Sequence, residues 1–374
     1  MGSVQTDTLE LPQPWIETPC VHSSALSKIA GCNIYLKLDI LQPSGSFKSR
    51  GIGNLMVRAV AKARAEYGPD ANVRFFCSSG GNAGLACATA ARQLGYPSSI
   101  VVPTATSDYM VAKVRALCDD VYQQGDNWAA ADKYLRETVM PSPSDMQTGS
   151  SGSIYPVYVP PFDHPDIWDG ASSIVEEVAT QLNGAHPDAF VCSVGGGGLM
   201  CGLMDGIDRV YGVPKSADSP PITKILAVET KGADSLMASA SAGQLVTLPG
   251  ISSIATSLGC VRVAEQTYSW LKQRPTAIHP VVVSDAESVN AIVRFLDDTR
   301  LLAEPACGAA LAPVYTPVAL SSTAPLKTTT LLRQKLGADM SDVAWAEQNI
   351  VVVVCGGSNI SLEILAEFRE RFGV

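Results

Sequence analysis

The stretch VRFFCSSGGNAGLACATAARQLGYPSSIVVPT, residues 73–104, holds a strand, a helix and a second strand in succession. Its two ends, VRFFCSS and SSIVVPT, are short runs of β-branched and aromatic residues in which apolar side chains are adjacent rather than alternating. Between them, GNAGLACATAARQLG is rich in helix formers and ends at Gly95, a residue suited to a left-handed helix cap. Two strands joined by a helix form the unit of a parallel sheet.

The same alternation continues outward from this stretch. Continuous apolar runs, typical of strands buried on both faces, begin at Asn33, Ala189, Lys224, His279 and Asn349. Helical segments of sufficient length to cover a sheet face lie between them. The sequence therefore predicts an α/β protein built on open, twisted, mostly parallel sheets flanked by helices. Two segments rich in Ser, Thr and Pro, 141–153 and 316–330, are predicted to be surface loops or insertions.

Composition limits the kind of partner. A chain of 374 residues with 46% hydrophobic residues can bury two domain cores, and its net charge of -9 argues against binding to a nucleic-acid backbone. No apolar run reaches the length of a membrane span, and the start lacks the pattern of a targeting peptide. The ten cysteines form no C-x-x-C pair. We expect a reduced, cytoplasmic enzyme that acts on a small molecule and has no membrane or nucleic-acid partner.

Three glycine-containing turns follow predicted strands. Gly195–Gly198 precede a small-residue helix, where backbone amides and the helix N-terminus favour a phosphate, although a tight turn alone also explains the glycines. Ser78–Gly84 begin another helix and suit a carboxylate, although simple capping explains them equally well. Cys355–Ser361 end the last strand. Ligands of open α/β sheets bind at the carboxyl ends of strands, where all three turns are predicted.

Lys48 lies in PSGSFKSRG, residues 43–51, directly before a predicted helix. A lysine in such a turn is a candidate nucleophile if it is desolvated, but most lysines are solvated surface residues. Taken alone, the segment leaves both interpretations open.

The four motifs PSGSFKSRG, SSGGNAG, SVGGGGL and CGGSNIS occur in the order and at the intervals of a known family. The chain resembles the fold-type II, tryptophan synthase β-like pyridoxal-phosphate enzymes, and within them the eukaryotic serine/threonine dehydratases. PFDHPDIWDG at Pro161 and EPACGAAL at Glu304 extend the resemblance over nearly the whole chain. It implies a large cofactor-binding catalytic domain of residues 1–41 and 160–374, and a small substrate-side domain of residues 42–159.

The resemblance also implies a role for each motif. Lys48 would bind pyridoxal 5'-phosphate covalently and act as the catalytic base, and Phe47 would pack on the pyridine ring. Cys355 would face the ring nitrogen; because a thiol is a weak acid-base partner, the ring would be a moderated electron sink. The other cofactor contacts implied are Asn82, Gly195, Gly196, Gly197, Gly198, Leu199 and Ser257. The substrate carboxylate would be held by Ser78, Ser79, Gly80 and Asn82. A potassium ion would be held by Glu229, Ala233, Ser235, Leu258 and Cys260, although Glu229 is also interpretable as a structural carboxylate.

The implied activity is β-elimination of L-serine to pyruvate and ammonia, extending to L-threonine with 2-oxobutanoate as product, by a homodimer. Ser257 replaces an alanine of the mammalian enzymes and Gly80 an alanine of some relatives, so substrate identity is less constrained than cofactor identity. One alternative is β-replacement, or elimination on an unusual amino acid. Another, of a different class, is a non-catalytic phosphate or nucleotide sensor.

Overall fold

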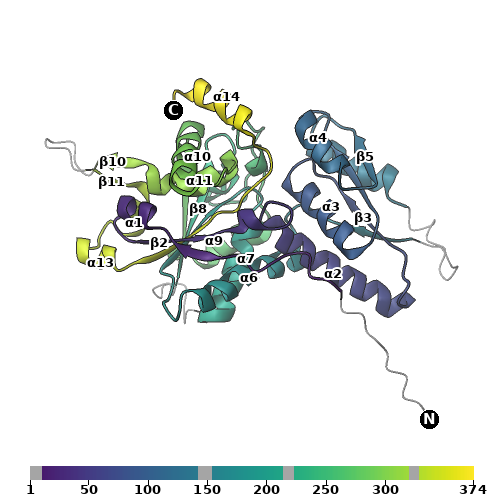
Figure 1. Cartoon of the computed structure of the whole chain (residues 1–374), viewed down its shortest axis with the longest axis horizontal. Coiled ribbons are helices and arrows are strands. Elements are labelled where there is room, and N and C mark those ends of the chain that lie inside the picture. Colours follow the sequence, from purple (N-terminus) through teal and green to yellow (C-terminus); the bar gives the residue numbers. More distant parts are fainter. Residues whose placement is uncertain (1–10, 142–153, 214–222, 320–327) are drawn as a thin grey trace, which may run out of the picture. The chain divides into compact units, whose positions relative to one another are not determined.

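The computed structural model describes residues 11–141, 154–213, 223–319 and 328–374 (Figure 1). The chain divides into two compact units. The smaller comprises Met1–Ile16 with Ile52–Pro161, and the larger comprises Glu17–Gly51 with Phe162–Val374. Compared with the domain bounds expected above, residues 42–51 lie in the larger unit and residues 11–16 in the smaller one.

A six-stranded sheet forms the centre of the larger unit, with strand order β1-β2-β12-β7-β8-β9. All neighbours are parallel except the edge pair β1 and β2. The strands are β1 (Cys20–His22), β2 (Asn33–Lys37), β7 (Ala189–Ser193), β8 (Lys224–Thr230), β9 (Ile278–Val283) and β12 (Asn349–Val353). Every residue of β7 is buried, as its continuous apolar sequence predicts for a central strand covered on both faces.

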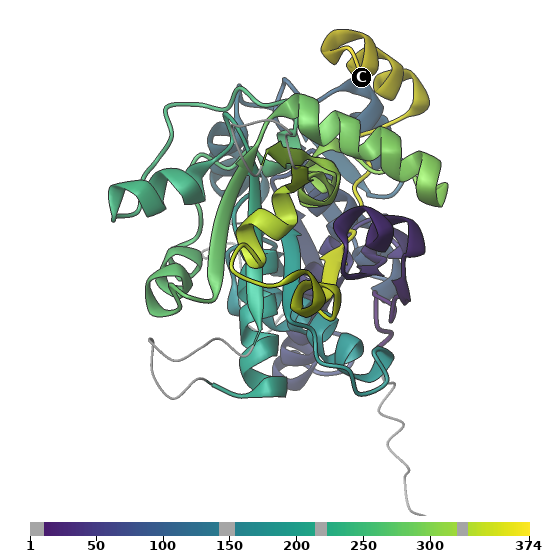
Figure 2. The ribbon, with the colours of Figure 1, turned by 90° about the vertical axis from the view of Figure 1, so that its left-hand side faces the viewer.

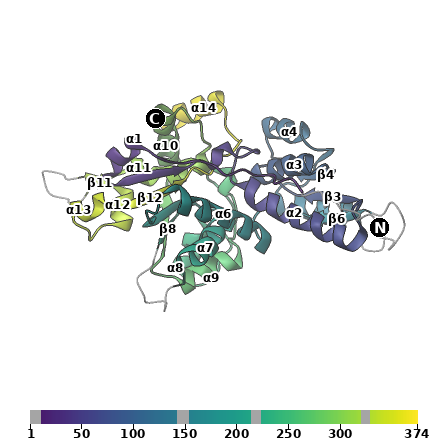
Figure 3. The same ribbon diagram turned by 60° about the horizontal axis from the view of Figure 1, so that its bottom comes forward.

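Helices cover both faces of this sheet. Figure 3 shows α6, α7, α8 and α9 on one side of the strands and α1, α10, α11 and α14 on the other, and Figure 2 shows α14 beside α10. The helices are α1 (Ser24–Ala30), α6 (Pro165–Gln181), α7 (Gly198–Tyr211), α8 (Ser235–Ala242), α9 (Glu265–Gln273), α10 (Asp285–Thr299), α11 (Pro305–Tyr315), α12 (Leu331–Leu336), α13 (Asp342–Ala346) and α14 (Leu362–Phe372). Short 3₁₀ turns occur at η1 (Asp39–Leu41) and η3 (Thr256–Leu258). All residues of α11 are buried, which accounts for its almost entirely apolar and small sequence.

The smaller unit holds a parallel four-stranded sheet in the order β5-β4-β3-β6. Its strands are β3 (Val73–Cys77), β4 (Ser98–Val102), β5 (Asp120–Gln123) and β6 (Tyr155–Tyr158). Its helices are α3 (Asn82–Leu94), α4 (Asp108–Arg115), α5 (Trp128–Tyr134) and a π-helical turn η2 (Leu135–Val139); α2 (Lys48–Tyr67) begins in the larger unit and continues into this one. The prediction that residues 73–104 form strand, helix and strand is confirmed.

The two predicted loops have different outcomes. Apart from Pro141, the segment 141–153 lies outside the described residues. In the second, β10 (Pro317–Ala319) pairs with β11 (Thr328–Thr330) as a short antiparallel ladder. The described ends of this segment are largely exposed, as a surface segment should be, and they pair as strands because Thr and Val form strands readily.

Candidate active site

Backbone hydrogen bonds hold the segment before Lys48 against the turn after β12. The amide of Phe47 donates to the carbonyl oxygen of Cys355 at 3.0 Å, and the amide of Gly357 donates to that of Gly45 at 2.9 Å. Lys48 is the first residue of α2, and its Nζ lies 5.1 Å from the centre of the Phe47 ring. The structure thus brings together Phe47, Lys48 and Cys355, as the sequence predicts.

Cys355 is a buried thiol. Its Sγ lies 3.4 Å from the hydroxyl oxygen of Ser193, at the end of β7. A hydrogen bond with the Cys307 thiol, together with burial, raises the pKa of Cys355 well above its usual value. The group is therefore a neutral thiol at physiological pH, which is the property that the sequence argument requires of it.

The glycine turn Gly195–Gly198 is enclosed on several sides. A Cβ on Gly196 would lie 2.3 Å from the Phe162 ring, and one on Gly197, whose φ is +90°, would lie 2.0 Å from Thr267 Oγ1. A Cβ on Gly195 would lie 3.0 Å from the Cα of Leu258. Glycine is therefore a steric requirement at Gly196 and Gly197, whereas a side chain at Gly195 would be tightly packed.

The peptide groups of this turn have a defined orientation. The carbonyl oxygen of Gly196 accepts from the Ala264 amide at 3.0 Å and from Thr267 Oγ1 at 3.3 Å. Among the described residues, none accepts a hydrogen bond from the amides of Gly195, Gly196 or Gly197. Donors without partners at the start of α7 fit a bound phosphate, and the buried Leu199 continues that first turn.

A second loop packs against the glycine turn. The Cβ position of Gly195 is 3.2 Å from the carbonyl oxygen of Ser257, and the Cys260 amide donates to the Leu258 carbonyl oxygen at 2.6 Å. Burial raises the pKa of the Cys260 thiol, while the positive charge of Lys48 acts in the opposite direction. The structure thus brings the segment Ser257–Cys260 to the same place as Lys48 and the glycines.

Glu229 lies fully buried near the end of β8. Its carboxylate accepts hydrogen bonds from the amides of Leu236 and Met237, at 2.8 and 2.7 Å, at the start of α8. Burial raises the pKa of Glu229 to about 8, although these two amides lower it. Ser235 Oγ, also buried, has no hydrogen-bond partner among the described residues. A buried carboxylate beside an unpartnered hydroxyl is an oxygen-rich environment that fits a hard monovalent cation.

The predicted carboxylate loop belongs to the smaller unit and joins β3 to α3. Ser78 is fully buried, and its hydroxyl donates to the Asp132 carboxylate at 2.6 Å. Ser79 Oγ accepts from the Gly81 amide at 3.3 Å, and Asn82 is the first residue of α3. The hydroxyl proton of Ser78 is therefore directed at Asp132, a partner that the sequence does not predict.

The space beside Gly80 is smaller than the absence of a side chain suggests. A Cβ added there would lie 2.5 Å from Thr106 Oγ1 and 2.6 Å from its methyl group. The space that an alanine side chain would occupy is thus filled by Thr106 in this chain. The expectation that Gly80 leaves substrate identity less constrained stays a prediction.

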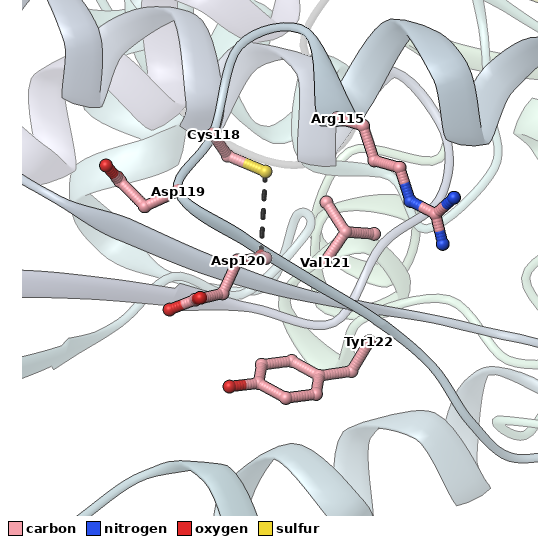
Figure 4. Close-up of a pocket in the computed structure, with 6 residues that line it drawn as sticks. All are labelled: Arg115, Cys118, Asp119, Asp120, Val121 and Tyr122. Carbon is pink, nitrogen blue, oxygen red and sulfur yellow. Dashed lines mark hydrogen bonds between the residues drawn. The ribbon is translucent and has the colours of Figure 1, made fainter.

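A separate pocket of about 420 Å³ lies at the carboxyl end of α4 and along β5 (Figure 4). Its lining is Arg115, Cys118, Asp119, Asp120, Val121 and Tyr122. The Cys118 thiol points at the Asp120 carbonyl oxygen, 3.6 Å away. None of the predicted site residues contributes to it, and we assign it no role.

Comparison with known proteins decides the family. A family model described as pyridoxal-phosphate dependent enzyme matches residues 11–328. The chain belongs to the pyridoxal-phosphate dependent enzyme family. Within that family it is 43% identical over 359 residues to the L-serine dehydratase/L-threonine deaminase of Bos taurus, covering 96% of each chain. It is 38% identical to the catabolic L-serine/threonine dehydratase of Saccharomyces cerevisiae, covering 90% of this chain and 86% of that one.

The solved structures agree. The crystal structure of a fungal L-serine ammonia-lyase from Rhizomucor miehei matches with a TM-score of 0.78 and 34% identity, over 96% of this chain and 100% of that chain. The predicted fold and the predicted pyridoxal phosphate are confirmed by these findings. No helix in the described part of the chain has the length and apolar character needed to cross a membrane.

Proposed function

We propose that this pyridoxal-phosphate enzyme eliminates the β-hydroxyl of L-serine to give pyruvate and ammonia, and converts L-threonine to 2-oxobutanoate. Dehydratases and a lyase of these amino acids are similar to it over nearly their whole lengths, at 34–43% identity. The observation that carries the proposal is the placement of Lys48 beside Phe47 and the Cys355 turn, in the same unit as a glycine turn with unpartnered amides.

Each residue predicted to contact the cofactor has a proposed part in holding it. Lys48 would bind its aldehyde carbon, Phe47 would pack on the ring, and Cys355 would face the ring nitrogen. The phosphate would be bound by the amides of the glycine turn, because they are donors at a helix N-terminus. The remaining proposed contacts are Leu199, Ser257 and Asn82. When bound, the cofactor supplies an electron sink that stabilises negative charge at the substrate Cα.

The chain's own residues supply position and proton transfer. Lys48 Nζ would take the proton from the substrate Cα as general base, which needs the amine within hydrogen-bond reach of that atom. Ser79, Gly80 and Asn82 would bind the substrate carboxylate. Ser78, proposed from the resemblance for the same task, would orient this loop through its bond to Asp132, because its hydroxyl proton is already donated. The low acidity of the Cys355 thiol favours elimination over reactions that need a long-lived carbanion.

We also propose that potassium binds to the Glu229 carboxylate, Ser235, Ala233 and the carbonyl oxygens of Leu258 and Cys260. The raised pKa of Glu229 supports this proposal, because a cation at the carboxylate would offset the burial that disfavours its charge. A cytoplasmic homodimer completes the proposal. Light scattering on the purified protein tests the dimer.

The deciding experiment compares wild type with Lys48→Ala and Lys62→Ala, the latter an exposed lysine of the same helix. Wild type and Lys62→Ala should form 2-oxo acid from serine, and borohydride should fix the cofactor on a peptide containing Lys48. Lys48→Ala should lose both the visible absorbance of the lysine-bound cofactor and, on the order of 10²-fold or more, the activity. Retention of both would overturn the assignment. A thioether product formed from serine and an added thiol, in place of pyruvate, would instead indicate β-replacement.

A further inference from the structure

Two residues after Lys48, the side chain of Arg50 is completely buried in a group of ionised side chains. Lys37, Asp39 and Arg50 have no exposed surface, and the Glu177 side chain is 13% exposed. We call Thr18, Lys37, Asp39, Arg50 and Glu177 the Arg50 cluster. All belong to the larger unit, from β2, η1, α2, α6 and the segment before β1.

Arg50 binds two carboxylates, each through two nitrogen atoms. Its Nε and Nη2 donate to the two oxygens of Asp39 at 2.7 and 2.8 Å. Its Nη1 and Nη2 donate to the two oxygens of Glu177 at 2.5 and 2.8 Å. Further bonds reach Ser173 Oγ at 2.9 Å and Thr18 Oγ1 at 3.0 Å. Every nitrogen of the guanidinium is used, so the planar group has one orientation only.

The charges of the cluster balance. Lys37 Nζ donates to Glu177 Oε2 at 2.5 Å, to the Thr18 carbonyl oxygen at 2.6 Å and to Gln181 Oε1 at 2.9 Å. Two cations thus face two carboxylates. A buried ion-pair network of this kind gives little net stability compared with apolar packing, because each charge loses its hydration. Its distinguishing property is a fixed geometry.

That geometry acts on the backbone at Lys48. On one side, the amide of Phe47 donates a hydrogen bond to the carbonyl oxygen of Cys355. On the other, Ser49 Oγ lies 2.8 Å from Ser44 Oγ, and Arg50 is held by Asp39 of η1. The residue after Asp39, Ile40, donates its amide to the carbonyl oxygen of Val354, beside Cys355. The Lys48 backbone is therefore held from both directions by the same turn after β12.

The position of Arg50 along α2 matters as well. The larger unit ends at Gly51, and the rest of α2, from Ile52, belongs to the smaller unit. Arg50 is thus the second-last residue before the chain leaves the larger unit. Thr18, which bonds to both Arg50 and Asp39, is the second residue after the chain enters that unit at Glu17. A displacement of the later turns of α2 is opposed at Arg50 before it reaches Lys48.

We propose that Arg50, held by Asp39 and Glu177, is a positioning residue that fixes the backbone of Lys48 and with it the reach of Lys48 Nζ. This proposal rests on the proposed catalytic role of Lys48. Small misplacement of a catalytic group lowers the rate of the chemical step much more than it weakens substrate binding. A lysine at position 50 keeps the charge but lacks the planar fork, and so cannot hold both carboxylates through paired bonds.

Arg209 provides a matched control. It also bonds two carboxylates, Asp169 and Glu176, and a serine hydroxyl, Ser172, all on α6. It lies on α7, and these hydrogen bonds do not involve the Arg50 cluster. Arg209→Lys therefore removes a similar set of bonds without touching the start of α2.

The experiment compares wild type, Arg50→Lys, Thr18→Val and Arg209→Lys at saturating pyridoxal phosphate, with L-serine as substrate. Arg50→Lys should lower kcat by roughly 10- to 100-fold and change KM by less than about 3-fold. Thr18→Val, which removes one hydroxyl and no charge, should lower kcat by a smaller factor in the same direction. Arg209→Lys should leave kcat within about 2-fold of wild type. If Arg50→Lys does not fold, the comparison of Thr18→Val with Arg209→Lys tests the proposal.

A second measurement uses the chain without its cofactor. Hydrogen exchange of the peptide spanning residues 44–52 should be faster in Arg50→Lys and Thr18→Val than in wild type, and unchanged in Arg209→Lys. Unchanged kcat and exchange in both cluster variants would overturn the proposal. Failure of the serine reaction in wild type would refute the proposed substrate only, since the exchange and the absorbance of the Lys48-bound cofactor still report on positioning.

Discussion

The backbone amide of Phe47 donates a hydrogen bond to the carbonyl oxygen of Cys355 across 3.0 Å. Through this bond, the residue that precedes Lys48 is joined to the turn that follows the central strand β12. Ser46 forms an isolated antiparallel bridge with Gly356 next to it. The lysine proposed to bind the cofactor and the residue proposed to face the ring nitrogen are therefore parts of one hydrogen-bonded structure.

Gly356→Ala should disrupt this structure. Gly356 has a φ of +77°, and a Cβ there would lie 2.3 Å from the Gly45 carbonyl oxygen. The left-handed φ costs an L-residue about 1–2 kcal/mol, and the overlap adds roughly 1–3 kcal/mol. We expect a lower free energy of unfolding and weaker binding of pyridoxal phosphate, measured by urea titration and by absorbance.

Gly373→Ala is the control for that substitution. Gly373 has a φ of +69°, and no heavy atom lies within 4 Å of its Cβ position. This variant should show the conformational cost alone and bind the cofactor like wild type. Equal effects of the two substitutions on cofactor binding would contradict a role for the Gly356 turn.

Thr267→Val should weaken cofactor binding by another route. Thr267 Oγ1 donates to the Gly196 carbonyl oxygen at 3.3 Å, which helps to orient the glycine turn. Valine has nearly the same shape but cannot donate, so we expect pyridoxal phosphate affinity to fall by roughly 5- to 10-fold, about 1 kcal/mol for one hydrogen bond. Thr299→Val, which removes a hydroxyl bonded to the Phe295 carbonyl oxygen on α10, should not change this affinity. Equal affinities in all three proteins would argue against a role for the Thr267 hydroxyl in orienting the glycine turn.

Most of the fold could be predicted from the sequence because its central strands are buried on both faces. The runs starting at Asn33, Ala189, Lys224 and Asn349 all correspond to observed strands. The short strands at sheet edges were not predicted. β5, with the sequence DVYQ, is only partly buried, so tertiary pairing rather than an apolar run determines it.

The residues that position the site were harder to predict than those proposed to bind ligands. Lys48 and the glycines stand in contiguous motifs. By contrast, Ser78 meets Asp132 across 54 residues, and Arg50 meets Glu177 across 127. Asp132 and Glu177 look like ordinary helical carboxylates in the sequence, and only the fold shows that these partly buried groups bond to Ser78 and Arg50.

Potassium should raise activity relative to lithium if Glu229 binds a cation. Glu229→Gln keeps the size of the side chain but removes the charge, so we expect the difference between the two salts to disappear and activity in potassium to fall. Glu287→Gln is the control, because Glu287 also accepts a backbone amide at a helix start, that of Ser284. A wild-type enzyme with the same rate in both salts would remove the case for this site.

Asp205, on α7, should contribute to the pH dependence of the protein's stability. Burial raises the pKa of Asp205 from 3.8 to about 6, against the opposing effect of Arg209. Between these two pH values the unfolded chain has lost a proton that the folded chain keeps. The contribution of this group to stability therefore falls as pH rises from about 4 to about 6 and stays lowered above that range.

Asp205→Asn has no proton to lose and should escape this penalty. Its free energy of unfolding relative to wild type should increase from pH 5 to pH 7, as measured by urea titration at each pH in the absence of cofactor. Asp208→Asn, three residues later, breaks the 2.9 Å ion pair with Arg274 and should instead be less stable than wild type at pH 7. If Asp205→Asn gained no stability over this interval, the carboxyl group would have to be ionised in the folded chain throughout. Its desolvation would then be offset by Arg209, because that is the cation that faces it.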